Sequence, residues 1–197
     1  RVLIMKILLF FIYCPLLVAN FNEAHNGFGI DIGKSGSGVF FTRQILHESE
    51  IISFNGEIRL YDIKSSDESV YYNQFTGGYE SIGGKSLFMV PIFLGANYYP
   101  FVGKIENNFS PFITARVGGV LSFDGKETGS FQERWEEPDI HLNQGGFLGL
   151  GIDFKMVGQT SVSVMLGFEL LPLKTEIDQM QDYSGTLIHI SFNRPRK

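Results

Sequence analysis

The sequence predicts an all-β fold, an eight-stranded antiparallel up-and-down barrel, and three observations lead to this prediction. Apolar and polar residues alternate with a period of two in several stretches, as in strands with one apolar and one polar face. Past the N-terminal segment, no stretch shows a sustained helical period of 3.6. Segments rich in Gly, Ser, Asn and Asp separate the alternating stretches. Apart from the first, short and long segments alternate along the chain.

Composition limits the class of protein. The chain has 197 residues, 44% hydrophobic and 14% aromatic, which is enough for one domain. Its formal net charge is -5, from 16 basic and 21 acidic residues, so it lacks the electropositive surface that nucleic-acid binding requires. We therefore expect no nucleic-acid partner.

The N-terminal segment has the order of a secretory signal peptide. Met5 and Lys6 precede an apolar run over residues 7–19, which is shorter than the ~20 residues that a helix needs to cross a bilayer. We expect residues 1–19 to be the signal peptide, with residues 1–4 read through from upstream, and residues 20–26 to be an N-terminal lead. Cys14 lies in the signal peptide, so the expected mature chain has no cysteine and no disulfide.

The barrel is expected over residues 27–193, before a basic tail at 194–197, and its first three strands at 27–34, 38–46 and 51–63. The third has the clearest pattern. Its apolar face holds Ile52, Phe54, Gly56, Ile58 and Leu60, and its polar face holds Ser53, Asn55, Glu57, Arg59 and Tyr61. This strand predicts one face in an apolar environment and one among polar groups.

The fourth and fifth strands are expected at 86–101 and 109–123. Pro91 falls inside the fourth strand, and a closed barrel has no free edge for a residue without an amide donor. We therefore expect a β-bulge at Pro91.

The last three strands are expected at 147–156, Ser161–Leu170 and 186–193. In the sixth, Leu148, Leu150 and Ile152 alternate with glycines and Asp153, and the seventh repeats the design with Val164, Leu166 and Phe168. These strands complete the set of eight.

Loop lengths favour a membrane barrel. The connections at 65–85, 124–144 and 174–184 are long, those at 47–49, 102–108 and 157–159 are short, and only the first, at 35–37, breaks the alternation. Such barrels have long outer loops and short periplasmic turns. An even number of strands also leaves both chain ends on the periplasmic side.

The chain resembles the small eight-stranded bacterial outer-membrane β-barrels, the OmpA/OmpX-like architecture, over roughly residues 25–193. The resemblance is carried by residues 90–101, by Ser110-Pro111-Phe112 and Arg116-Val117-Gly118, and by Gly149-Leu150-Gly151. It implies an integral outer-membrane location and a monomer surrounded by lipid and lipopolysaccharide, with the long loops open to a surface partner. It implies no activity, because these motifs mark a fold.

If the apolar faces meet lipid, the charged residues of the strands point inward. This expected interior polar network comprises Asp31, Glu57, Arg59, Arg116, Asp153, Lys155, Glu169 and His189. An eight-stranded barrel has an interior just wide enough for side chains to fill, and an unpaired buried charge is costly. We therefore expect these charges to pair and to leave no open pore.

A second candidate site is the acidic outer loop. It comprises Asp124, Glu127, Glu133, Glu136, Glu137 and Asp139, with Trp135, the one tryptophan of the chain, among them. Carboxylates are ligands for divalent cations, but the spacing of an EF-hand is absent. We interpret the loop as solvated, and a cation shared with lipopolysaccharide phosphates is the alternative.

Motifs for catalysis and cofactors are weak. Gly83-Gly84-Lys85-Ser86 lacks the glycine that a phosphate-binding loop has five residues before Gly84, where Tyr79 stands. The four histidines have no metal-ligand spacing, so we expect no metal and no cofactor. His189 and Ser191 share one face of the last strand beside Glu169, a set typical of an activated nucleophile, but all three are expected to face away from lipid.

The main hypothesis is a non-enzymatic outer-membrane barrel with a structural or surface-interaction role. The alternatives are a soluble periplasmic lipocalin-like carrier of an apolar ligand and a lipid A-modifying barrel enzyme. Polarity separates the outer-membrane barrel from the soluble carrier, because a soluble carrier buries its apolar faces and exposes its polar ones.

Overall fold

The computed structural model describes residues 21–34, 36–63, 69–75, 77–82, 87–105, 108–125, 135–156, 160–177 and 180–195. The expected signal peptide and the Gly83–Ser86 motif lie outside these residues. Tyr79, which stands five residues before Gly84, lies within them. Within the described residues, no helix is long and apolar enough to cross a membrane.

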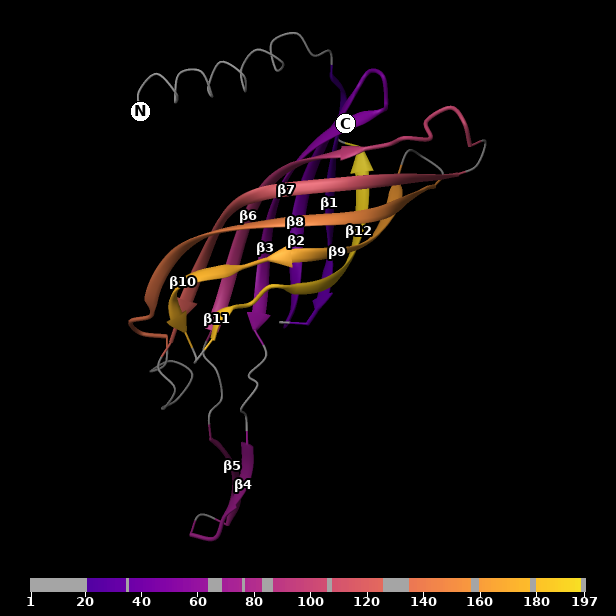
Figure 1. The fold of residues 1–197 in the computed structure, drawn as a ribbon. Helices are drawn as coiled ribbons and strands as arrows, with labels where there is room; N and C mark the ends of the chain where they lie inside the picture. The colour runs from indigo at the N-terminus through magenta and orange to yellow at the C-terminus, as the bar shows by residue number, and fades with distance from the viewer. Residues whose placement is uncertain are drawn as a thin grey trace, which may run out of the picture.

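Eight strands close into an antiparallel barrel in the order β1-β12-β9-β8-β7-β6-β3-β2 (Figure 1). They are β1 (Phe21–Gly33), β2 (Gly36–His47), β3 (Ile52–Ile63), β6 (Leu87–Tyr98), β7 (Phe109–Asp124), β8 (Asp139–Lys155), β9 (Ser161–Leu170) and β12 (Gly185–Pro195). Each strand pairs with its neighbours along the chain, and β1 and β12 close the ring. The predicted all-β, eight-stranded, up-and-down barrel is therefore confirmed.

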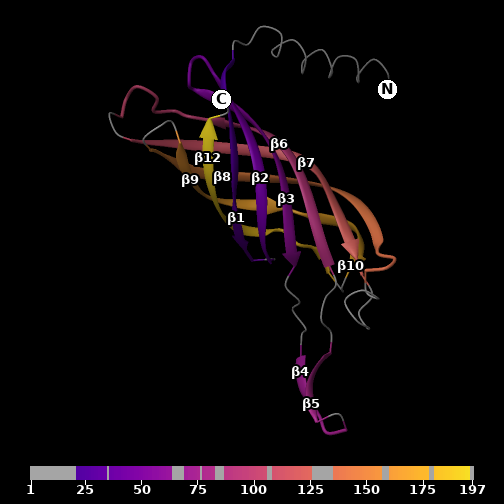
Figure 2. The same ribbon diagram turned by 180° about the vertical axis from the view of Figure 1, so that it is seen from behind.

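Two short hairpins extend the end of the barrel opposite the chain termini (Figures 1 and 2). They pair β4 (Ser69–Asn73) with β5 (Gly78–Ile82), and β10 (Pro172–Ile177) with β11 (Met180–Asp182). The sequence predicted loops over most of these residues, and each hairpin forms a two-stranded sheet apart from the barrel. Gly77 has a φ of 66° in the β4–β5 turn, a conformation that glycine adopts without steric cost.

Some strands are longer than predicted. β1 begins at Phe21, so most of the expected lead is strand, and β8 begins at Asp139, where the sequence predicted loop up to 144. The β7–β8 ladder continues as far as the pair Asp124–Asp139, and backbone pairing with β7 extends β8 through Gly145 and Gly146. Pairing with the neighbouring strand β7 thus holds in a strand two glycines that suggested a loop.

The expected bulge at Pro91 is wrong. The β3–β6 register is the same before and after it, with Ile58 opposite Ile92 and Tyr61 opposite Met89, and no pairs between these two. On its other side, Pro91 pairs in register with Val120. The barrel accommodates the missing amide as a local gap in one ladder.

The barrel has a polar centre and an apolar outer surface. Large apolar side chains on the outside are highly exposed, for example Leu148 (62%), Leu150 (64%) and Leu166 (62%). Inside, Arg59 and His189 are fully buried, together with apolar residues such as Phe93 and Met89. A soluble carrier has the opposite polarity, so the predicted orientation of the two faces is that of a barrel surrounded by lipid.

Candidate functional site

A cluster of charged side chains crosses the middle of the barrel interior. It comprises Asp31 from β1, Glu57 and Arg59 from β3, Arg116 from β7, Glu169 from β9 and His189 from β12. All six are buried, because each occupies an inward position of a strand whose alternate residues face outward. Residues far apart in the sequence thus meet because the sheet closes on itself.

Glu57 connects the two arginines of the charge cluster. Its carboxylate accepts hydrogen bonds from Arg59 Nε through one oxygen and from Arg116 Nη1 through the other. Among the described residues, Arg116 has no other carboxylate within ion-pair distance, whereas Arg59 also donates from Nη1 to Glu169 Oε1 at 2.7 Å. Glu57 is therefore the acid on which the charge balance of Arg116 depends.

His189 and Asp31 form the opposite side of the cluster. His189 Nδ1 lies 2.6 Å from Asp31 Oδ1, and Asp31 Oδ2 is 3.7 Å from Arg59 Nε. The imidazole stacks on Phe40 with ring centroids 3.7 Å apart and an angle of 15° between the planes. This position orients the ring toward Asp31 and leaves it no contact with solvent.

Aromatic rings close the space around the arginines. The Arg59 guanidinium carbon lies 5.2 Å from the ring centres of both Phe93 and Phe147, and that of Arg116 lies 5.6 Å from Phe147. These distances are those of cation–π contacts. The Phe147 ring fits because Gly167 is beside it: an added Cβ there would lie 2.5 Å from Phe147 Cζ.

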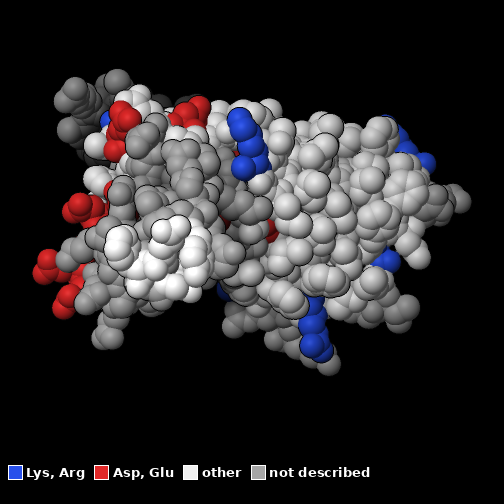
Figure 3. All heavy atoms as spheres, turned by 90° about the horizontal axis from the view of Figure 1, so that it is seen from below, with Lys and Arg blue, Asp and Glu red and all other residues white. Residues whose placement is uncertain are grey.

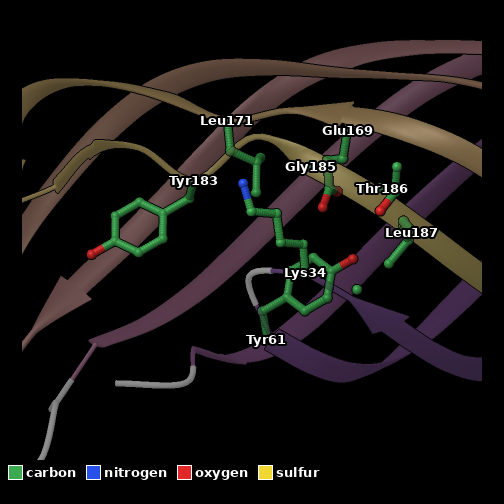
Figure 4. Close-up of a pocket in the computed structure, with 10 residues that line it drawn as sticks. Lys34, Tyr61, Glu169, Leu171, Tyr183, Gly185, Thr186 and Leu187 are labelled. Carbon is green, nitrogen blue, oxygen red and sulfur yellow. The ribbon is translucent and has the colours of Figure 1, made fainter. Parts of the chain in front are cut away.

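Little space remains between the charge cluster and the hairpin end of the barrel. A cavity of about 10 Å³ lies there, lined by Lys34, Tyr61, Glu169, Leu171 and Tyr183 among others (Figure 4). That volume holds about one water molecule. Tyr61, Leu171, Tyr183 and Leu187 around this cavity are buried, as expected where side chains fill the interior of a barrel of eight strands.

At the end with the chain termini, the interior opens into a vestibule of about 910 Å³. Its inner polar groups are linked: Tyr99 donates to Asp153 Oδ2 at 2.8 Å, and Gln44 donates to the Tyr99 hydroxyl at 2.9 Å. Asp153 is therefore inside the barrel but belongs to this second group, separate from the charge cluster.

Lys155 does not lie in the packed interior, and this expectation is wrong. Its side chain is 61% exposed, and its amine lies 3.9 Å from Glu50 in the turn after β2. Lys155 is the last residue of β8, where the barrel opens into the vestibule, so its strand position no longer places it among packed side chains.

The expected acidic outer loop is only partly described. Glu127 and Glu133 lie outside the described residues, while Asp124 and Asp139 pair across strands β7 and β8 and so belong to the barrel sheet. Exposed acids among the described residues at this end include Asp62, Glu136, Glu137, Asp139, Glu176 and Asp182. Figure 3 views this end and shows acidic side chains gathered on one side of it. Ser184 donates to Asp182 from its hydroxyl and its amide, which lowers the pKa of that carboxyl.

The residues considered for catalysis are not arranged as a triad. His189 contacts Asp31, Glu169 accepts from Arg59, and the Ser191 hydroxyl accepts from Asn193 at 3.3 Å. Among the described residues, no group of three His, Cys, Asp or Glu side chains is arranged to hold a metal ion.

Sequence reasoning missed Tyr99, Gln44 and Phe147 as parts of these interior groups. Gln44 shares the inward side of β2 with Phe40 and Thr42, but the weak alternation of this strand left its orientation open in the sequence. Tyr99 lies one residue beyond the end of β6 but inside the fourth strand predicted at 86–101, and it is buried on the same side as Asn97.

No model of a protein family matches the chain, and no curated protein matches it. Among solved structures, the chain is similar to Neisserial surface protein A (NspA), with a TM-score of 0.57 and 9% identity over 89% of this chain and 97% of that chain. Two further similar structures are the N-terminal β-barrel domain of Pseudomonas aeruginosa OprF (TM-score 0.45, 8% identity, 88% and 99% covered) and Ail, the attachment invasion locus protein of Yersinia pestis (0.47, 10%, 87% and 97%). The similarity to NspA shows that the fold is that of a small outer-membrane β-barrel, as the sequence predicted.

Proposed function

We propose that this protein is a non-enzymatic, monomeric integral outer-membrane barrel that has no conducting pore and acts through the parts that extend beyond the membrane. The observation that carries the proposal is the closed interior. The charge cluster with its aromatic rings lies inside the barrel, and in the part of the chain that the structure describes a cavity of about 10 Å³ lies between it and the hairpin end. A barrel without a water-filled path has its accessible surface at its two ends.

The apolar outer face supports the membrane location. Outward side chains such as Ile30, Phe41, Leu94, Val117 and Leu150 are between 48% and 70% exposed, which is costly in water over so large an area. Lipid removes this cost. The expected periplasmic end, with both termini and the short turns, is then the end of the vestibule.

A surface-interaction role is supported by the hairpin end. The β4–β5 hairpin projects away from the barrel (Figure 1), and Tyr72 and Phe75 on it are 54% and 101% exposed. Exposed aromatic side chains are enriched where proteins contact partners. The structurally similar NspA is described as a surface protein, which agrees with this proposal.

Two measurements test the proposal. Fractionated cells that express the protein should yield it in the outer membrane, resistant to carbonate, and unheated detergent samples should migrate differently from heated ones on a gel. Recovery in the soluble periplasm would refute the membrane location. Purified protein in planar bilayers should give no steady conductance steps, and regular steps would refute the closed interior.

The surface role has its own test. A variant in which Tyr72 and Phe75 are both replaced by serine should keep the gel shift of the folded barrel, because neither residue is in the barrel sheet. Cells with the wild-type protein should adhere better to host-cell monolayers or matrix proteins than cells with this variant. A matched control replaces Phe101 and Val102 in an exposed turn at the vestibule end, and equal loss in both variants would contradict the proposal.

A further inference from the structure

The outer face of β12, β1, β2 and β3 combines an apolar groove with a pair of arginines. Figure 2 shows these strands side by side. The groove has a volume of about 550 Å³ and is lined by Phe28, Ile30, Val39, Phe41 and Ile58, together with Leu60, Ile190 and Phe192. Phe28 and Phe192 stack along it with ring centroids 5.9 Å apart. The groove is a lipid-facing hollow wide enough for a hydrocarbon chain.

The strand register places the residues of this face in rows. One row of the groove is Phe192, Phe28, Phe41 and Ile58, each the pairing partner of the next. The adjacent row, two residues closer to the chain termini, is Arg194, Asn26, Arg43 and Gly56. Both arginines are exposed and share the outward parity of the phenylalanines beside them. Two cations therefore flank Asn26 at one end of the apolar groove.

Within the described part of the chain, no ion pair neutralises these arginines. The ion pairs found among the described residues involve Arg59, Arg116, Lys155 and His189, and neither Arg43 nor Arg194. Between the arginines, the Asn26 side-chain oxygen is buried and has no hydrogen-bond partner in the described structure. An amide oxygen accepts hydrogen bonds, so the donors that this row offers to an anion are the two guanidiniums.

The outer face beside Arg43 holds a position without a side chain. Gly56 is its cross-strand neighbour, and a Cβ added to Gly56 would meet only Leu94 Cδ2, at 3.3 Å. A guanidinium presents paired donors that match a phosphate. The row thus offers two guanidiniums next to a groove for an acyl chain.

The row also lies at a suitable depth. Seven residues separate Asn26 from Gly33 at the other end of β1, which is about 18 Å along the barrel axis at ~3.3 Å per residue and a tilt of ~40°. The apolar band of such barrels is about 25 Å tall. With Gly33 at one edge of the band, the row lies about 7 Å inside the other edge, and the long arginine side chains extend from there toward the headgroups.

We infer that this face binds an anionic glycerophospholipid of the inner leaflet, with its phosphate between Arg43 and Arg194 and one acyl chain in the groove. The inference rests on the proposed membrane location and assigns a specific lipid site to it. Charge complementarity decides the occupant: a second copy of this chain would bring two more arginines to the same row, whereas a phosphodiester lipid brings the missing negative charge.

Native mass spectrometry of the folded protein, released from detergent with equimolar dioleoyl-phosphatidylglycerol and dioleoyl-phosphatidylcholine, tests the site. We expect one retained phosphatidylglycerol per barrel. Each of Arg43→Gln and Arg194→Gln should lower the preference for phosphatidylglycerol about fivefold, the effect of one basic residue near a charged lipid surface. Lys104→Gln removes the same charge from an exposed turn at the same end and should leave the preference unchanged. Glycerol 3-phosphate, which has no acyl chain, should not be retained.

The outcomes are distinguishable. An equal loss in Lys104→Gln, or no loss in either arginine variant, would show that only the overall charge matters and would overturn the site. A dimer in place of the lipid adduct would assign the groove to a second copy and would overturn it too. All variants are first tested for the gel shift of the folded barrel in vesicles, and wild-type protein that fails to insert would refute the proposed function instead.

Discussion

Replacing Glu57 with glutamine is expected to be one of the most destabilising single changes in the barrel interior. The glutamate accepts from both buried arginines, and among the described residues it is the one carboxylate within ion-pair distance of Arg116. The glutamine has one oxygen acceptor and no charge, so Arg116 stays buried without a counter-charge. Breaking a buried ion pair in this way costs about 3–5 kcal/mol.

Glu169→Gln provides the matched control. Glu169 accepts one hydrogen bond from Arg59 Nη1, and Arg59 keeps Glu57 and Asp31 as partners when this bond is lost. The loss should be about 1.5–3 kcal/mol, the contribution of one hydrogen bond to a charged group. The structure thus predicts that two buried carboxylates on the same cluster differ in their effect on stability.

A double-mutant cycle identifies the cause. Arg116→Met removes the cation with a side chain of similar length, so the variant with both changes should recover about 1–3 kcal/mol of the loss expected from adding the two single changes. Urea titration of the protein folded in lipid vesicles measures each free energy of unfolding. The reasoning fails if Glu57→Gln costs no more than Glu169→Gln, or if the effects of Glu57→Gln and Arg116→Met simply add.

Three further predictions follow from the same structure. Ile58→Arg places a charge on the lipid-facing surface, where Ile58 is 48% exposed, and should cost about 2–4 kcal/mol in vesicle urea titrations, whereas Ile58→Leu should cost less than about 1.5 kcal/mol; a harmless Ile58→Arg would reverse the assignment of the two faces. Alanine at both His189 and Ser191 should leave lipid A unchanged by mass spectrometry, and a lipid A change that needs these two residues would identify an enzyme. Tyr99→Phe removes the donor to Asp153 Oδ2 and should cost about 1–3 kcal/mol in the same titration, and no loss would show that water replaces the hydroxyl.

In the strands with a clear alternation, the sequence by itself determined which residues face the interior and which face outward. Alternation is a local property of a strand, because successive side chains point to opposite sides whatever the strand pairs with. The polar parity of Glu57 and Arg59 on one strand and the apolar parity of Leu148 and Leu150 on another are therefore readable from a few neighbouring residues. The alternation of loop lengths added the up-and-down connection and the side on which the chain ends lie.

The ends of the strands were harder to predict from the sequence. Backbone pairing with a neighbouring strand extends a strand through residues with a weak preference for β-structure. Gly145 and Gly146 suggested a loop, yet both pair with β7 in the long ladder to Asp139. Tertiary context also decided two other positions. Lys155 has a strand position but lies at the mouth of the vestibule. The β3–β6 register accommodates the missing amide of Pro91 without a bulge.

Only the tertiary structure decided which interior groups meet. Glu57 and Arg116 are separated by 59 residues, and Arg59 and Glu169 by 110, and their contacts depend on how far each strand is shifted against the next when the sheet closes. That shift is a property of the whole ring, since it sums the registers of all neighbouring pairs. The row of Arg194, Asn26 and Arg43 on the outer face arises in the same way, from β12 and β2 pairing on either side of β1.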